Sequence, residues 1–136
     1  MKQNRISPKN IISLKPWEIF VFGSNLSGFH GAGAAKIAMG WGAKWGKAQG
    51  LCGNTYAIPT KSYFAKESLS LEHIKTNINF FLSEAKSYFE YNFMVTEIGC
   101  GLAGYTPKDI APLFKGAIDI GNIFLPETFW NELLLL

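Results

Sequence analysis

The residues of this sequence best suited to bind a ligand lie in two stretches rich in glycine, residues 23–33 and 99–105. Glycine lets a backbone approach a ligand without an intervening Cβ, and successive backbone N–H groups in such a loop can donate to phosphate oxygens. These residue types and spacings therefore predict a phosphate site. The candidate ligand-binding residues are Ser24, Asn25, Gly28, Gly31, Ala32 and Gly33 in the first stretch and Gly99, Cys100, Gly101, Leu102, Ala103, Gly104 and Tyr105 in the second.

Three polar side chains in or beside these stretches are candidates for catalysis. The amide of Asn25 both donates and accepts, which suits a ribose diol, and an Asx turn that closes a strand is the structural alternative. His30 could act as a general acid or base near neutral pH, or it could be an exposed loop histidine. Glu97 could orient a water molecule or hold ribose hydroxyls, or it could pair with a lysine on a covering helix.

The remaining candidates are two aromatic residues and a cysteine. Phe29 could pack on a ribose or base, with an ordinary core position as the alternative, and Tyr105 could do the same or only contact the entry to a helix. Cys100 precedes a predicted helix start, and the N-terminal end of a helix lowers the pKa of a nearby thiol. A nucleophilic cysteine also needs a base within reach, and none is identifiable beside Cys100. We interpret Cys100 as a small residue in a tight loop. Because the two histidines and two cysteines show no ligand spacing, we predict no metal site. We also expect no cofactor.

The order of predicted elements explains how the two glycine stretches could meet. Strands are predicted at 18–22, 55–59 (ended by Pro59), 93–98 and 122–125. Helices are predicted at 32–39, 71–89 with Ser70 as N-cap, from Thr106 onward, and at 127–135. Alternating strands and helices predict an α/β fold, a three-layer α/β/α sandwich with a largely parallel sheet.

Both glycine stretches follow a strand and precede a helix. In a parallel sheet they would lie together at the carboxyl edge, where such folds bind ligands, and each helix would add its positive N-terminal end. The structural alternative is that these glycines only close tight turns and let helices pack on the sheet.

Residues 40–54 are predicted to form a loop, because glycines recur through them. This segment interleaves Trp41, Lys44, Trp45 and Lys47. Such a pattern could stack on and neutralise single-stranded nucleic acid, and a flap packed on its own core is the alternative.

Composition bounds the class of protein. A chain of 136 residues is expected to form one domain with its own core, and 48% hydrophobic with 17% charged residues fits a globular protein. The net charge of +3 is compatible with a phosphate-bearing ligand but is too small to require nucleic acid. Residues 1–10 carry Lys2, Arg5 and Lys9 without an acid, and we predict a flexible, solvated arm there.

The same composition indicates a compartment. The sequence has no signal-peptide pattern and no apolar run of the ~20 residues that span a bilayer, so we expect a cytoplasmic protein with reduced thiols and no membrane partner. The closing Leu133–Leu136 is interpreted as the end of a packed helix or as the cover of a neighbouring subunit, which would make the protein an oligomer.

Three segments in order resemble the macrodomain family, a group of ADP-ribose-binding α/β modules. In that family a strand ends in an Asn at the ligand and leads into a glycine-rich loop and an alanine-rich helix, as Asn25 leads into Leu26–Ala35 here. Asn54–Pro59 matches a family segment that leads into an apolar strand and a proline, and Ile98–Pro107 matches the later strand, glycine loop, Gly-Tyr pair and proline. Within the family, the sequence is similar to short phage and bacterial macrodomain-like proteins of undefined activity.

The resemblance implies that ADP-ribose or a related nucleotide diphosphate binds at the two loops, and that an ADP-ribosyl bond is a candidate for hydrolysis. Asn25 would then hold the distal ribose, the loops Leu26–Gly33 and Gly99–Tyr105 the diphosphate, and His30 or Glu97 would be the acid–base group.

The sequence departs from the family in one important place. Members usually carry an upstream Gly-Asp-Ile-like element whose Asp contacts adenine, but this chain has Lys15–Glu18 there and no Asp before Asp109. It also lacks the Gly-Gly-Gly and downstream Gln-Glu-Glu of the poly-ADP-ribose glycohydrolases. Recognition of the base is therefore open. A non-catalytic sensor of a nucleotide signal and a single-stranded nucleic-acid binder are the alternative functions.

Overall fold

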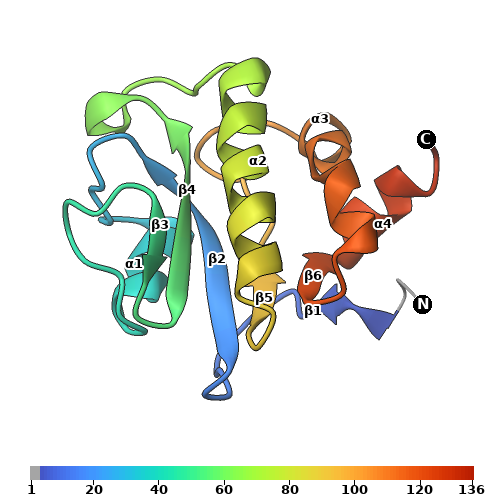
Figure 1. Ribbon diagram of the computed structural model, residues 1–136. Helices are drawn as coiled ribbons and strands as arrows, with labels where there is room; N and C mark the ends of the chain where they lie inside the picture. Colours follow the sequence, from blue (N-terminus) through green and yellow to red (C-terminus); the bar gives the residue numbers. More distant parts are fainter. Residues whose placement is uncertain (1–3) are drawn as a thin grey trace.

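A six-stranded sheet forms the centre of the computed structural model, which describes residues 4–136 (Figure 1). The strand order is β1-β6-β5-β2-β4-β3, and every neighbouring pair is parallel except the antiparallel pair β3–β4. The strands are β1 (Ile6–Ser7), β2 (Glu18–Asn25), β3 (Gly50–Cys52), β4 (Thr55–Lys61), β5 (Asn92–Val95) and β6 (Ile123–Pro126). The predicted α/β fold with a largely parallel sheet is confirmed.

Helices cover both faces of this sheet. The helices are α1 (Gly33–Met39), α2 (Leu71–Ser87), α3 (Pro107–Ile110) and α4 (Glu127–Leu133), with 3-10 segments η2 (Tyr63–Ala65) and η3 (Ala111–Asp119). In Figure 1, α2, α3 and α4 lie on the near side of the sheet and α1 lies behind it. The arrangement is the predicted three-layer sandwich.

Strand β2 connects the two layers because its side chains alternate between two cores. Ile19 and Val21 belong to a large core with residues of α2, η3 and α4, and Phe20 and Phe22 belong to a smaller core with Ala35 and Ala38 of α1. All four strand residues are at most 2% exposed. This is the pattern of a strand buried on both faces, as the unbroken apolar run predicts.

Local signals define the long helix α2 as the sequence predicts. The Ser70 hydroxyl accepts a hydrogen bond from the backbone N–H of His73 at 3.1 Å, and Glu72 lies in the first turn. Ile74, Ile78, Phe81 and Ala85 are fully buried on one face. The helix ends at Ser87, two residues before the predicted end.

Helix α3 begins with the predicted capping box. The side chain of Asp109 accepts from the backbone N–H of Thr106 at 3.0 Å. The α-helical hydrogen bonds end at Ile110, and the 3-10 segment η3 begins there, with Pro112 in its first turn, where a missing N–H costs little.

Two of the wrong element boundaries concern β3 and β4. Residues 40–54 are not all loop, because Gly50–Cys52 pairs with β4 as the edge strand β3. Pro59 does not end β4, which continues to Lys61. The pairing of β3 with β4 ends at Ala57, before Pro59. The Pro59 carbonyl oxygen accepts from Asn77 Nδ2 at 3.0 Å and not from a neighbouring strand. The N–H that proline lacks therefore leaves no hydrogen bond of the sheet unmade.

The N-terminal segment is part of the fold over the residues described, which corrects the expectation of a solvated arm. Ile6 and Ser7 pair with β6, and the Arg5 guanidinium donates four hydrogen bonds to backbone carbonyl oxygens. Their lengths are 2.6 to 3.3 Å, and their acceptors are Ala117, Ile118, Ile120 and Ile123. Lys2 lies outside the described residues. The reason for the wrong prediction is that every Arg5 partner is more than a hundred positions away in the chain.

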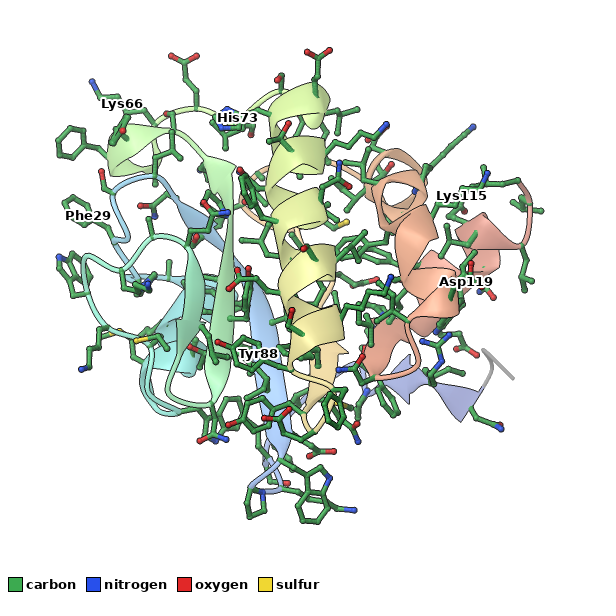
Figure 2. All side chains as sticks on the ribbon, viewed as in Figure 1. Phe29, Lys66, His73, Tyr88, Lys115 and Asp119 are labelled. Carbon is green, nitrogen blue, oxygen red and sulfur yellow. The ribbon has the colours of Figure 1, made fainter. Side chains whose placement is uncertain are left out.

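The Arg5 contacts predict a loss of stability on substitution. Arg5→Ala leaves carbonyl oxygens at the end of η3 without their charged donor, so the free energy of unfolding should fall by about 2 kcal/mol in urea denaturation. Arg5→Lys should recover only part of this, because an ammonium lacks the planar fork of donors. Lys115→Ala, at an exposed position in η3, is the control (Figure 2). Unchanged stability of Arg5→Ala would contradict the structural role of this residue.

Candidate functional site

A cleft of about 1050 Å³ lies at the carboxyl ends of β2, β4 and β5. Both glycine stretches contribute to its lining, as the order of elements predicts. The predicted residues that line it are Ser24, Asn25, Phe29, Gly31, Ala32, Gly33, Glu97, Gly99, Cys100, Gly101, Leu102 and Ala103.

The two glycine stretches face one another across this cleft. A Cβ placed on Gly33 would lie 4.0 Å from Leu102 Cδ1, and one placed on Gly23 would lie 3.7 Å from the backbone nitrogen of Gly99. Because strands β2 and β5 are parallel neighbours, the loops that follow them leave the sheet side by side.

Backbone donors line both sides of the cleft. Among residues 4–136, none accepts a hydrogen bond from the backbone N–H of Gly31, Ala32, Gly101, Leu102 or Ala103. Backbone N–H groups of a folded protein are nearly always paired with protein, water or ligand. Because these residues line the cleft and most of them are exposed, their donors are accessible to water or to an anion.

Packing does not require glycine at two of these positions. A Cβ on Gly31 or on Gly101 would have no protein atom within 4 Å, and neither residue has a positive φ. The fold would accept alanine at both places, and both residues are exposed and line the cleft. By contrast, a Cβ on Gly28 would lie 2.5 Å from the carbonyl carbon of Gly46, so Gly28 is required by the fold.

The structure gives Asn25 a role within its own loop. Its Nδ2 donates to the carbonyl oxygen of Phe29 at 2.8 Å, and its Oδ1 accepts from the backbone N–H of Phe29 at 3.0 Å. Both halves of the amide are thus occupied by the backbone of Phe29, four positions on, rather than two positions on as in the Asx turn considered above. The side chain has a structural role in the loop and is not free to bind a ribose. Asn25 fixes the path of the first loop.

His30 lies beneath the first loop and outside the residues that line the cleft. It is 2% exposed, packs edge-on against Phe22, and places Nε2 3.1 Å from the carbonyl oxygen of Lys47. A carbonyl can only accept, so Nε2 carries the proton. Neither predicted role, that of a catalytic acid–base group or that of an exposed loop histidine, fits this position. The contact of His30 with Lys47, 17 positions along the chain, depends on the folded structure, and the local sequence does not encode it.

Glu97 is the predicted catalytic residue that the structure leaves accessible in the cleft. It follows β5, which ends at Val95 rather than at Ile98, and its side chain is exposed. Its Oε2 accepts from Thr128 Oγ1 of α4 at 2.6 Å, so its partner is a hydroxyl and not the lysine considered above.

Four of the predicted site residues lie outside the cleft lining, and their contacts are structural. Gly104 and Tyr105 close the second loop, where the Tyr105 hydroxyl donates to the carbonyl oxygen of Leu69 at 2.6 Å, the structural alternative for that residue. Gly28 and His30 complete this group. Their glycine and aromatic types match a ligand loop in sequence, but their contacts are with the protein itself.

Cys100 lines the cleft, and its surroundings oppose ionisation. Burial, followed by the Glu97 and Asp109 carboxylates, raises the pKa of its thiol to about 12. The thiol is therefore neutral near pH 7, which agrees with the interpretation of a small loop residue rather than a nucleophile.

The sequence missed several residues of the cleft. The contributors are Lys9 and Asn10 from the supposed arm, Ile11 and Ile12 directly after it, Thr60 and Lys61 at the end of β4, Thr96, and Trp45. The signal available for Thr60 and Lys61 was their position at a strand end, which the proline at 59 concealed.

Two kinds of feature are absent from residues 4–136. No group of three or more His, Cys, Asp or Glu side chains is arranged to hold a metal ion there. Within the same residues, no helix has both the length and the apolar character needed to cross a bilayer. His73 is exposed on α2 and away from the cleft (Figure 2).

Comparison with known proteins supports the fold and leaves the function open. No protein-family model and no curated protein matches this chain. A solved structure of a protein of unknown function from Bacteroides thetaiotaomicron is similar, with a TM-score of 0.60 and 12% sequence identity. The similarity covers 85% of this chain and 88% of that one.

The raised pKa of Cys100 predicts slow alkylation. In a Cys52→Ser variant, which leaves Cys100 as the single cysteine, the reaction with iodoacetamide at pH 8 should be at least about a hundredfold slower than that of free cysteine, because each pKa unit lowers the thiolate fraction about tenfold. The rate should still be rising with pH above pH 10. A rate equal to that of free cysteine at pH 8 would contradict this environment.

Proposed function

We propose that this chain binds a nucleotide diphosphate, ADP-ribose or a related molecule, with the diphosphate held between its two glycine loops. The observation that carries the proposal is the set of unpaired backbone N–H groups on both sides of one cleft. Donors of this kind, fixed by the backbone, suit phosphate oxygens.

Charge and space support the same ligand class. Lys9 and Lys61 line the cleft, and among residues 4–136 Glu97 is the one acidic residue that does so. The open space beside Gly31 and Gly101 allows a phosphate to approach the backbone closely. Helix α1 has only seven residues, so the proposal relies on loop N–H groups rather than on a helix dipole.

The resemblance to macrodomains supports ADP-ribose among nucleotide diphosphates. The residue roles differ from those that the resemblance implies, because the Asn25 amide is engaged by Phe29 and His30 is buried.

Hydrolysis of an ADP-ribosyl bond is part of the proposal, with Glu97 as the acid–base group. Binding without turnover is the second candidate function, favoured by the presence of one carboxylate, that of Glu97, in the cleft lining formed by residues 4–136. Cys52 and Cys100 are both free thiols, and we retain a reducing, cytoplasmic compartment as part of the proposal.

Substitution of the glycines that packing does not require tests the diphosphate site. Gly101→Ala and Gly31→Ala should leave the melting temperature unchanged and weaken binding of ADP-ribose and pyrophosphate about tenfold, or about 1.4 kcal/mol, the value of one hydrogen bond. Isothermal titration calorimetry gives the affinities.

The matched control is Gly121→Ala, because Gly121 also has open space at its Cβ position but lies outside the cleft lining. It should bind like the unsubstituted protein. Failure of the unsubstituted protein to bind any diphosphate, or equal effects of Gly101→Ala and Gly121→Ala, would contradict the proposal.

Turnover is tested separately at Glu97. Glu97→Gln removes the proton-transfer group while keeping its size, so hydrolysis of an ADP-ribosylated peptide should fall at least about a hundredfold, with ADP-ribose affinity changed less than about threefold. Thr128→Val, which removes the hydroxyl that donates to Glu97, should retain most of the activity. Unchanged hydrolysis by Glu97→Gln would exclude Glu97 as the acid–base group.

A further inference from the structure

Three aromatic side chains meet at the end of the cleft nearest β4. The rings of Phe29 and Trp45 stack with centroids 4.9 Å apart and planes 16° apart, and Phe64 packs against Phe29 with centroids 5.6 Å apart. They come from the first glycine loop, the following loop and η2. We call Phe29, Trp45 and Phe64 the aromatic platform.

The aromatic platform is exposed to solvent and continuous with the cleft. Trp45 is 58% and Phe64 66% exposed, while Phe29 is half-buried between them. Phe29 and Trp45 both line the cleft, together with Ala65, which follows Phe64. Figure 2 shows Phe29 at the margin of the molecule, on the side that carries β3 and β4.

The backbone of η2 is strained at Phe64, whose ring is largely exposed. Phe64 and Ala65 have φ angles of 60° and 54°, in the left-handed region that bulky residues rarely occupy. The N–H of Phe64 donates to Ser27 Oγ at 2.9 Å, and the N–H of Ala65 donates to the carbonyl oxygen of Ser62 at 3.0 Å. Because the Phe64 ring is largely exposed, this strained backbone adds little buried apolar surface to the core. Backbone strain of this kind is concentrated at functional and ligand-binding sites.

The remaining contacts hold Phe29 in place. Its backbone N–H and carbonyl are both bound by the Asn25 amide, at 3.0 and 2.8 Å. The asparagine at the end of β2 therefore positions the central ring of the aromatic platform as well as the first loop.

From these observations we propose that the aromatic platform binds the planar base of the nucleotide, with the exposed Trp45 ring as the stacking surface. This inference rests on the proposed function, because the diphosphate between the loops would direct the base toward one end of the cleft. The exposed side chains Ile12 and Ile37, which also line the cleft, are aliphatic and offer no ring to stack on.

Chemistry favours a nucleobase as the occupant. Stacking on an aromatic ring is available to every base, since each has a π face, and it needs no carboxylate to read the base edge. This accounts for a nucleotide site in a chain with no aspartate before Asp109. It also predicts weak discrimination among ADP, GDP and UDP.

The test compares ligands with and without a base. Trp45→Ala should weaken binding of ADP about tenfold or more in calorimetry, while changing the affinity for inorganic pyrophosphate less than about twofold. Trp45→Phe keeps a ring and should retain most of the ADP affinity. Trp17→Ala removes a tryptophan of comparable exposure, outside the cleft lining, and should have no effect. Circular dichroism checks that each variant is folded.

Tryptophan fluorescence gives a second measurement. ADP should quench the emission of the unsubstituted protein and pyrophosphate should not, and the quenching should disappear in Trp45→Phe.

Each outcome separates this inference from the proposed function. Pyrophosphate binding with no gain from the base, or equal weakening of both ligands by Trp45→Ala, would overturn the aromatic platform and leave the diphosphate site standing. Binding of neither ligand would overturn both. Tighter, steeply salt-dependent binding of a short single-stranded DNA that Trp45→Ala abolishes would assign the aromatic platform to nucleic acid instead.

Discussion

The parallel pairing of β2 with β5 on one side and β4 on the other is the constraint on which the rest of the structure depends. Residues Ile19–Phe22 of β2 contribute to both hydrophobic cores. A shift of β2 by one residue would therefore exchange the side chains on its two faces. With the register fixed, the chain after β2 and the chain after β5 emerge next to one another. The cleft follows from this geometry, because neighbouring parallel strands bring loops of distant sequence to one edge.

Hydrogen bonds from the loops convert this edge into a defined site. Ser24 Oγ donates to the carbonyl oxygen of Ala48 at 2.5 Å, which ties the end of β2 to the loop that carries Trp45. Ser27 accepts from Phe64, and Ser68 donates to the carbonyl oxygen of Ala103 in the second glycine loop. Segments around the cleft are thus joined by short polar side chains. Such cross-links hold the backbone donors in place before a ligand arrives, which reduces the entropy lost on binding.

Local signals were sufficient for much of the fold. The Ser70 cap and the apolar spacing of α2, and the capping box of Thr106 with Asp109, depend on neighbours in sequence, and the structure has both. The order of strands, glycine loops and helices likewise predicts which loops share an edge. The burial of His30 and the pairing of Ile6 with Leu125 depend on partners brought close by the folded chain, so no local pattern encodes them. The aromatic platform is of the same kind, since its rings come from separate segments.

The central claim is that backbone N–H groups of both glycine loops hold a diphosphate. The most direct measurement is a titration of ¹⁵N-labelled protein with ADP-ribose, followed by amide chemical shifts. The account predicts that the largest shifts fall on Gly31, Ala32 and residues 101–103, with Gly121 unchanged. Absence of shifts at saturating ADP-ribose, or shifts confined to residues outside the two loops, would contradict it.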